Sequence, residues 1–117
     1  MSSARQIASR NENRESQFKG DFSCFLVSMD NPELEIAIRP LDVSPRGLGF
    51  LVRQEIPGGQ FFYLRIGEVE TKLRVELAYC SSYLGIENLF RCGLFLREEQ
   101  GDLKLLCIKA GILDIIS

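Results

Sequence analysis

The 117-residue sequence contains no histidine. Histidine is the commonest general base and a frequent zinc ligand, so its absence removes most catalytic triads and dyads and every mixed cysteine–histidine zinc site. The cysteines form no C-x-x-C pair, and each has apolar neighbours in the sequence; they are Cys24, Cys80, Cys92 and Cys107. We therefore expect small buried thiols, with no metal ion and no cofactor.

Long apolar runs and nucleotide-cradling loops are also missing. No apolar stretch approaches the ~20 residues that a membrane-spanning helix requires, and residues 1–16 lack the apolar core of a signal peptide, which predicts a cytoplasmic protein with no membrane insertion. No Gly-x-x-x-x-Gly-Lys loop occurs, and no general base lies near Asp42 or Ser44 in the sequence. An enzyme is not expected.

The charged residues divide the chain into two parts. Residues 1–20 carry four basic and two acidic side chains, whereas residues 21–117 carry 10 basic and 14 acidic ones. The first part is poor in apolar residues and has no period that would bury a face, so we expect a flexible basic arm over 1–20 and one globular domain over 21–117. An acidic body repels DNA, whose affinity depends on phosphate neutralisation. A barrel for single-stranded nucleic acid would need aromatic residues on a basic face, which this body does not offer.

From residue 21 onward, short apolar segments alternate with turn residues at spacings of about ten, which is typical of an antiparallel barrel or sandwich. Over 69–80 the apolar side chains follow a period of two, as in a strand with one buried face. We predict strands near 22–29, 33–41, 47–54, 60–66, 69–80 and 87–96.

The C-terminal segment predicts a helix over about 99–116. Leu103, Leu106 and Cys107 begin an apolar series at spacings of three and four, with Asp102 near the helix start. Gly111 weakens the second half. A second apolar series covers much of the other side, so either a neighbouring loop buries it or the helix forms a homodimer or protein-partner interface.

The stretch "LDVSPRGLGF" at 41–50 contains Asp42, Ser44 and Gly47 in the order Asp-x-Ser-x-x-Gly. Taken alone, these residues suffice for a turn between two strands, because Asp and Ser accept hydrogen bonds from nearby backbone and Pro45 fixes φ. The same Asp and Ser could instead contact a ligand. Arg46, between the Ser and the Gly, is a candidate for an additional contact.

A second motif lies upstream, where "RNENR" places Arg10 and Arg14 in the order Arg-x-x-x-Arg. An arginine fork binds phosphate and the O6/N7 edge of guanine, while a carboxylate such as Asp42 accepts from the N1–H and N2–H groups of guanine. The alternative for the two arginines is a solvated charge run.

The conjunction of the two motifs, 27 residues apart, resembles the PilZ domain, the bacterial receptor module for cyclic di-GMP. "RCGLFL" at 91–96 is similar to a later strand of that family. The resemblance implies a six-stranded antiparallel β-barrel with a C-terminal α-helix, and a non-enzymatic sensor whose arm folds over the ligand. It implies that Arg10 and Arg14 grip phosphate and guanine, that Asp42 and Ser44 contact a guanine edge, and that Gly47 lets the backbone turn beside the ligand. Many members carry a further Arg where this chain has Ser9. The alternative is a PilZ-like interaction adaptor that works through the helix without binding nucleotide.

Overall fold

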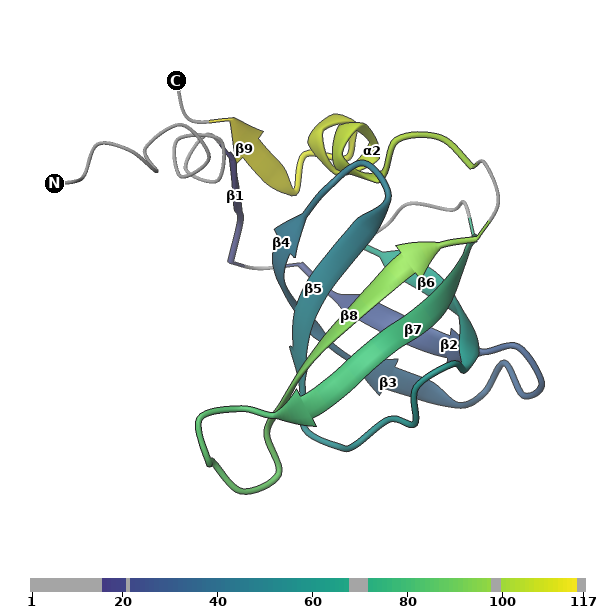
Figure 1. Ribbon diagram of the computed structural model, residues 1–117. Helices are drawn as coiled ribbons and strands as arrows, with labels where there is room; N and C mark the ends of the chain where they lie inside the picture. The colour runs from purple at the N-terminus through teal and green to yellow at the C-terminus, as the bar shows by residue number, and fades with distance from the viewer. Residues whose placement is uncertain (1–15, 21, 68–71, 98–99, 116–117) are drawn as a thin grey trace, which may run out of the picture.

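The computed structural model describes residues 16–20, 22–67, 72–97 and 100–115, and within them antiparallel β-structure predominates (Figure 1). Seven strands form the larger sheet in the order β3-β2-β6-β7-β8-β5-β4. In chain order they are β2 (Cys24–Ser28), β3 (Glu35–Ala37), β4 (Arg39–Val43), β5 (Gly47–Val52), β6 (Phe61–Ile66), β7 (Leu73–Ser82) and β8 (Phe90–Leu96). All six predicted strand positions are therefore occupied by β-structure.

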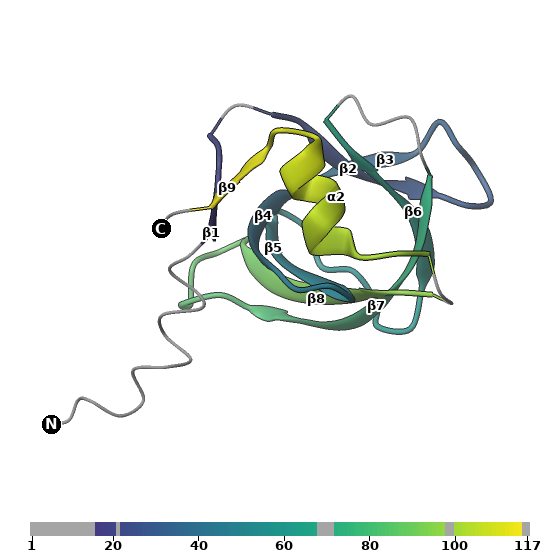
Figure 2. The same cartoon turned by 90° about the horizontal axis from the view of Figure 1, so that it is seen from above.

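The predicted six-stranded closed barrel is wrong, because the sheet has seven strands and is open. The strand predicted over 33–41 is interrupted at Ile38, whose side chain is buried and whose N–H donates to the Cys24 carbonyl at 2.9 Å. Its two halves pair with different neighbours, β3 with β2 and β4 with β5, and so become the two edges of the sheet. The sheet curves strongly, as Figure 2 shows, but no hydrogen-bonded ladder joins these two described edge strands.

The concave side of the sheet holds the hydrophobic core. Period-two alternation places one face of each central strand inside, where Phe50, Leu64 and Leu77 are almost fully buried. The helix α2 (Leu103–Lys109) lies across one end of the curved sheet (Figure 2) and buries Leu103 and Cys107 in the same core. No helix in the described ranges is long and apolar enough to cross a membrane.

The predicted C-terminal helix is real but shorter than expected. Asp102 caps its start, accepting the Leu105 N–H at 2.9 Å, and the helix ends at Lys109. Gly111 follows with φ of +79°, a conformation that terminates helices. The chain then forms β9 (Leu113–Ile115), so the expectation of a helix reaching residue 116 is wrong.

The end of the predicted arm also needs correction. Residues 16–18 form the strand β1 (Ser16–Phe18), which pairs with β9 in a separate two-stranded sheet. The arm as predicted therefore overlaps the folded structure at its C-terminal end. Its two arginines, Arg10 and Arg14, lie outside the described residues.

Candidate functional site

The predicted turn motif forms the tip of the β4–β5 hairpin. The Ser44 N–H donates to the Gly47 carbonyl at 2.9 Å, and the Gly47 N–H donates to the Ser44 hydroxyl at 3.1 Å. Serine, proline and glycine at the first, second and fourth positions match the preferences of a tight turn. Gly47 does not adopt positive φ; a β-carbon there would lie 3.0 Å from the Leu94 carbonyl oxygen, a tight contact that favours glycine at this position.

Asp42 is not part of this turn but lies within β4, directly after a β-bulge. Pro40 pairs with Phe50 and Asp42 with Gly49, so Leu41 is the extra residue. Since Pro40 faces the same side as the buried Phe50, strict alternation would point Asp42 inward as well. The bulge instead turns the carboxylate to the outer, convex face, where bulges near functional sites often direct a side chain.

A second bulge directs Tyr79 to the same outer face. Leu77 pairs with Leu94 and Tyr79 with Gly93, so Ala78 is the extra residue in β7. The period of two predicted over 69–80 would place Tyr79 on the same face as Leu77, which is buried. The bulge places Tyr79 on the opposite face, so the regular alternation is wrong at this residue. The Tyr79 side chain is 47% exposed.

Four residues lie in one row across four strands: Asp42 on β4, Gly49 on β5, Gly93 on β8 and Tyr79 on β7. A β-carbon on Gly49 would lie 2.6 Å from Oδ1 of Asp42, and one on Gly93 would lie 2.8 Å from Cζ of Tyr79. The carboxylate and the phenol ring therefore rest directly on bare glycine backbone. We call these four residues the glycine row.

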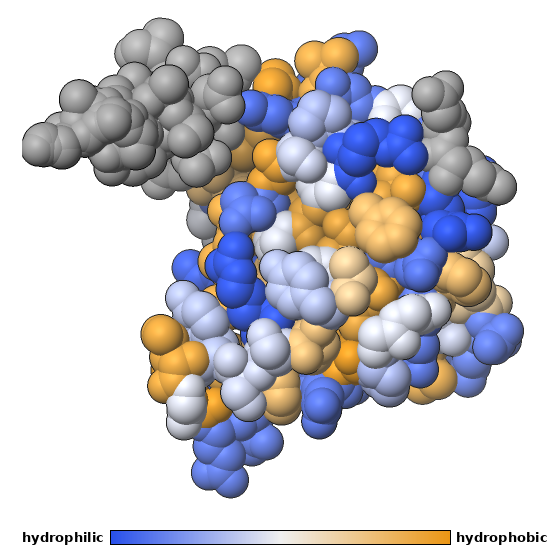
Figure 3. All heavy atoms as spheres, viewed as in Figure 1, coloured by the Kyte–Doolittle hydropathy of each residue, from blue (hydrophilic) through white to orange (hydrophobic). Residues whose placement is uncertain are grey.

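The glycine row is part of the lining of a shallow pocket of about 600 Å³ on the outer face. Ser44 and Gly47 of the turn border it on one side, and Phe95 of β8 borders it as well. Figure 3 shows hydrophobic and hydrophilic side chains next to each other on the face that carries β5, β8 and β7. A carboxylate beside two exposed aromatic rings suits a planar ligand with N–H donors along one edge.

Arg91 of β8 connects the two ends of this row. Its guanidinium donates to Oδ2 of Asp42 at 2.9 Å, and it also interacts with the Tyr79 hydroxyl. Partial burial lowers the pKa of Arg91, but the hydrogen bonds to Asp42 and Tyr79 outweigh this effect and raise the pKa above its ordinary value. Arg91 is therefore charged at every physiological pH.

The turn is also tied to the helix and to β8. The Pro45 carbonyl accepts the N–H of Leu103, the first residue of α2, at 2.8 Å, and the Arg46 carbonyl accepts the Leu96 N–H at 2.8 Å. The Arg46 guanidinium lies 3.4 Å from the Leu96 carbonyl oxygen. A movement of the turn would thus be transmitted to the start of α2.

The described chain begins close to the strand that carries Asp42. Phe18 of β1 shares a surface pocket with Arg39, Pro40 and Leu41 of β4, and Figure 2 shows β1 next to β4. The last residue of the Arg-x-x-x-Arg element precedes Ser16 by only two positions, which span at most about 7 Å of extended chain.

Of the predicted ligand-binding residues, Asp42, Ser44 and Gly47 line one pocket, whereas Arg46 belongs to the same turn but directs its guanidinium to the Leu96 carbonyl. Four further residues at the site were not predicted as site residues: Gly49, Tyr79, Arg91 and Gly93. A signal for Gly93 did exist, since an isolated glycine inside a strand often marks a close approach. Among the described residues, no group of three potential metal-ligating side chains could hold an ion.

Comparison of the chain with protein-family models, with curated proteins and with solved structures finds no match.

Proposed function

We propose that this protein is a PilZ-like receptor for cyclic di-GMP, with a guanine base lying on the glycine row and the N-terminal arm closing over the ligand. The observation that supports this most directly is the row itself, in which two glycines allow a carboxylate and an aromatic ring to lie flat against the outer face and line one pocket. Asp42 would accept from the N1–H and N2–H groups of guanine, while the base plane packs against the exposed Tyr79 ring, which itself covers Gly93.

The turn and the arm supply the remaining contacts. The Ser44 hydroxyl accepts one backbone hydrogen bond and still carries a proton that it can donate to the ligand. Arg10 and Arg14 would grip the phosphates and the second guanine edge, and Arg46 is a further candidate. Four to five charge-assisted hydrogen bonds of about 1.5–3 kcal/mol each, less the cost of ordering the arm, are compatible with micromolar affinity, about 8 kcal/mol.

A receptor also needs an output. Because the turn accepts a hydrogen bond from the first residue of α2, ligand contacts at Ser44 and Gly47 would bias the position of the helix. An arm ordered over the ligand would change the surface beside β4 at the same time. A partner protein that discriminates these two surfaces would read the signal.

Isothermal titration with cyclic di-GMP at tens of micromolar protein tests the assignment. We expect Arg14→Ala and Arg10→Ala each to weaken binding at least tenfold without changing the unfolding transition, because each removes charge-assisted hydrogen bonds. Arg5→Ala is the matched control, since it removes the same charge from the same arm outside the motif, and it should stay within about twofold of the parent. No heat with the parent would refute cyclic di-GMP binding, and parental affinity in Arg14→Ala would refute the role of that arginine.

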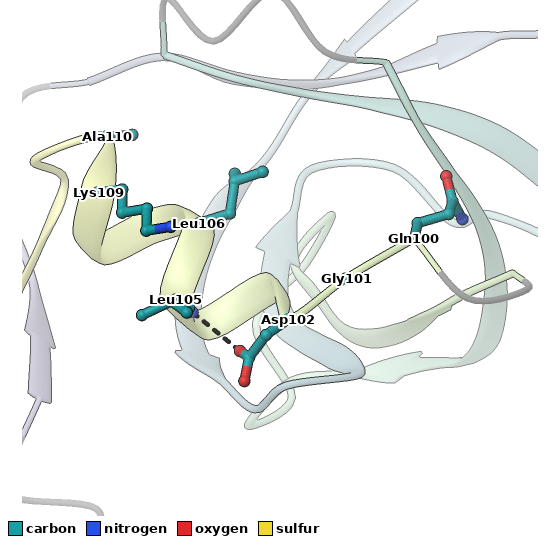
Figure 4. Close-up of a pocket in the computed structure, with 7 residues that line it drawn as sticks. All are labelled: Gln100, Gly101, Asp102, Leu105, Leu106, Lys109 and Ala110. Atoms are coloured by element: carbon teal, nitrogen blue, oxygen red, sulfur yellow. Dashed lines mark hydrogen bonds between the residues drawn. The ribbon is translucent and has the colours of Figure 1, made fainter.

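A PilZ-like adaptor without nucleotide is the second candidate, and one observation favours it. Leu105 on α2 is 47% exposed beside a pocket of about 410 Å³ that Leu106 and the methylenes of Lys109 also line (Figure 4). Such a surface could receive an apolar side chain of a partner. Leu105→Arg should then abolish partner capture while leaving any cyclic di-GMP titration unchanged, whereas loss of both would indicate a folding defect.

A further inference from the structure

The carboxylate proposed to recognise guanine is already engaged inside the protein. Oδ2 of Asp42 accepts the Arg91 guanidinium at 2.9 Å, and the side chains of both residues remain partly exposed. A ligand that is to use this carboxylate fully must therefore share it with Arg91 or displace Arg91 from it.

The Arg91 guanidinium and a guanine base present the same arrangement of hydrogen-bond donors. A guanidinium presents N–H groups on neighbouring nitrogens joined through one carbon, and the N1–H and N2–H groups of guanine are likewise joined through C2. Adenine has no such pair, since its N1 is an acceptor. The structure thus shows, at the Asp42 carboxylate, a group with the donor pattern of guanine.

We infer that Arg91 is an internal placeholder for guanine, which the base displaces from Asp42 when it binds. This inference rests on the proposed cyclic di-GMP function and deepens it, because it names a residue that lowers the affinity of the site by competing with the base. Guanine would replace the single Arg91 donor at Oδ2 and bring a second N–H to the same carboxylate. Adenine-containing analogues cannot do so, and they leave the Asp42–Arg91 pair intact.

The geometry also explains why displacement is feasible. The pair is exposed, with side-chain exposures of 64% for Asp42 and 36% for Arg91, and such pairs are weak in water. After displacement, water can hydrate the Arg91 guanidinium, because its side chain is 36% exposed. Guanine then gains the carboxylate, and the guanidinium is not left without a partner.

The test is Arg91→Met, which keeps an unbranched side chain and removes the competitor. Titration with cyclic di-GMP should give binding about two- to fivefold tighter than the parent, the gain expected from removing one exposed ion pair. The gain should vanish in an Asp42→Asn background, because a neutral amide forms no ion pair with Arg91 and there is then no competition to remove. Cyclic di-AMP should bind none of these proteins.

The matched control is Arg65→Met. Arg65 of β6 forms an exposed ion pair of 2.7 Å with Glu35 of β3, the edge strand opposite β4. The variant therefore loses the same charge without changing a residue that lines the pocket. Its affinity should equal that of the parent or fall slightly. This control separates the local competition from the general loss of one positive charge against an anionic ligand.

The outcomes are distinguishable. If the parent binds and Arg91→Met binds equally or more weakly, Arg91 is not a placeholder, whereas the proposed function stands. If the parent shows no heat but Arg91→Met binds, Arg91 occupies the carboxylate as inferred, whereas the proposed function of the parent chain as a cyclic di-GMP receptor fails. If neither protein binds, the proposed function fails and the placeholder fails with it.

Discussion

Gly49→Ala should separate ligand binding from folding. The added β-carbon would lie 2.6 Å from Oδ1 of Asp42, whereas ordinary contact begins at 3.4 Å, so the carboxylate must move by roughly 0.8 Å or change rotamer. Asp42 can do this because its side chain is 64% exposed. The substitution therefore displaces the carboxylate from its place over Gly49 and adds a methyl group to the pocket floor.

The two effects differ in magnitude. On stability, the loss of an exposed ion pair costs about 0–1 kcal/mol, and replacing glycine by alanine within a strand returns roughly 0.5–1 kcal/mol, so the free energy of unfolding should change by less than about 1 kcal/mol. On binding, the displaced carboxylate loses hydrogen bonds to guanine of about 1.5–3 kcal/mol each. Cyclic di-GMP should therefore bind at least about tenfold more weakly.

Calorimetric titration and urea unfolding measure the two quantities on the same samples. Gly58→Ala is the matched control, because its β-carbon would make only an ordinary contact, 3.8 Å from the Ala78 carbonyl oxygen. Asp42→Ala should weaken binding by a similar factor. The double variant, Gly49→Ala with Asp42→Ala, should bind little worse than either single variant, because both changes take the same carboxylate away from the ligand. Affinity within twofold of the parent in Gly49→Ala would refute the placement of guanine on the glycine row.

Two further predictions concern the core. Leu64→Ala removes a side chain with no exposed surface from the centre of the sheet and should lower the free energy of unfolding by about 2–5 kcal/mol in urea titrations, whereas Leu34→Ala, at a site 59% exposed, should change it by less than about 0.5 kcal/mol. Equal effects would contradict the assigned core. Burial raises the pKa of Cys24 to about 12, with a contribution from nearby Cys107, while the unfolded thiol titrates near 9. The native state thus holds its proton longer, and stability should be unaffected below pH 9 and fall above it by up to about 1.4 kcal/mol per pH unit. A parent and Cys24→Ala with parallel pH profiles from 8 to 11 would refute this.

Much of the sheet could be predicted because its signals are local. Alternating apolar residues placed β6 and β7 within a few residues, and Asp102 correctly marked the helix start. The end of the helix could not be located in the same way, because Gly111 only weakens a helix locally. What redirects the chain there is pairing between β9 and β1, two segments almost 100 residues apart in the sequence.

The site also contains residues with a local sequence signal and residues without one. The turn at Ser44, Pro45 and Gly47 was correctly predicted, because its hydrogen bonds are made within four residues. The prediction that Asp42 helps to build this turn is wrong, since Asp42 lies within β4. The Asp42–Arg91 pair depends on β4 pairing with β5 and β5 with β8, and no local pattern contains that information. The arm arginines remain a prediction from the sequence.

The two bulges determine both the register of the sheet and the face on which two of the site residues lie. A shift of one residue in a strand moves every side chain to the opposite face, so Asp42 and Tyr79 reach the outer face only because Leu41 and Ala78 each add one residue. Without the first bulge, the carboxylate would enter the core, where an unpaired charge costs several kcal/mol. The bulge and the aspartate are therefore coupled: the polar side chain disfavours the regular register, and the irregular register places the side chain over Gly49, where a ligand can reach it.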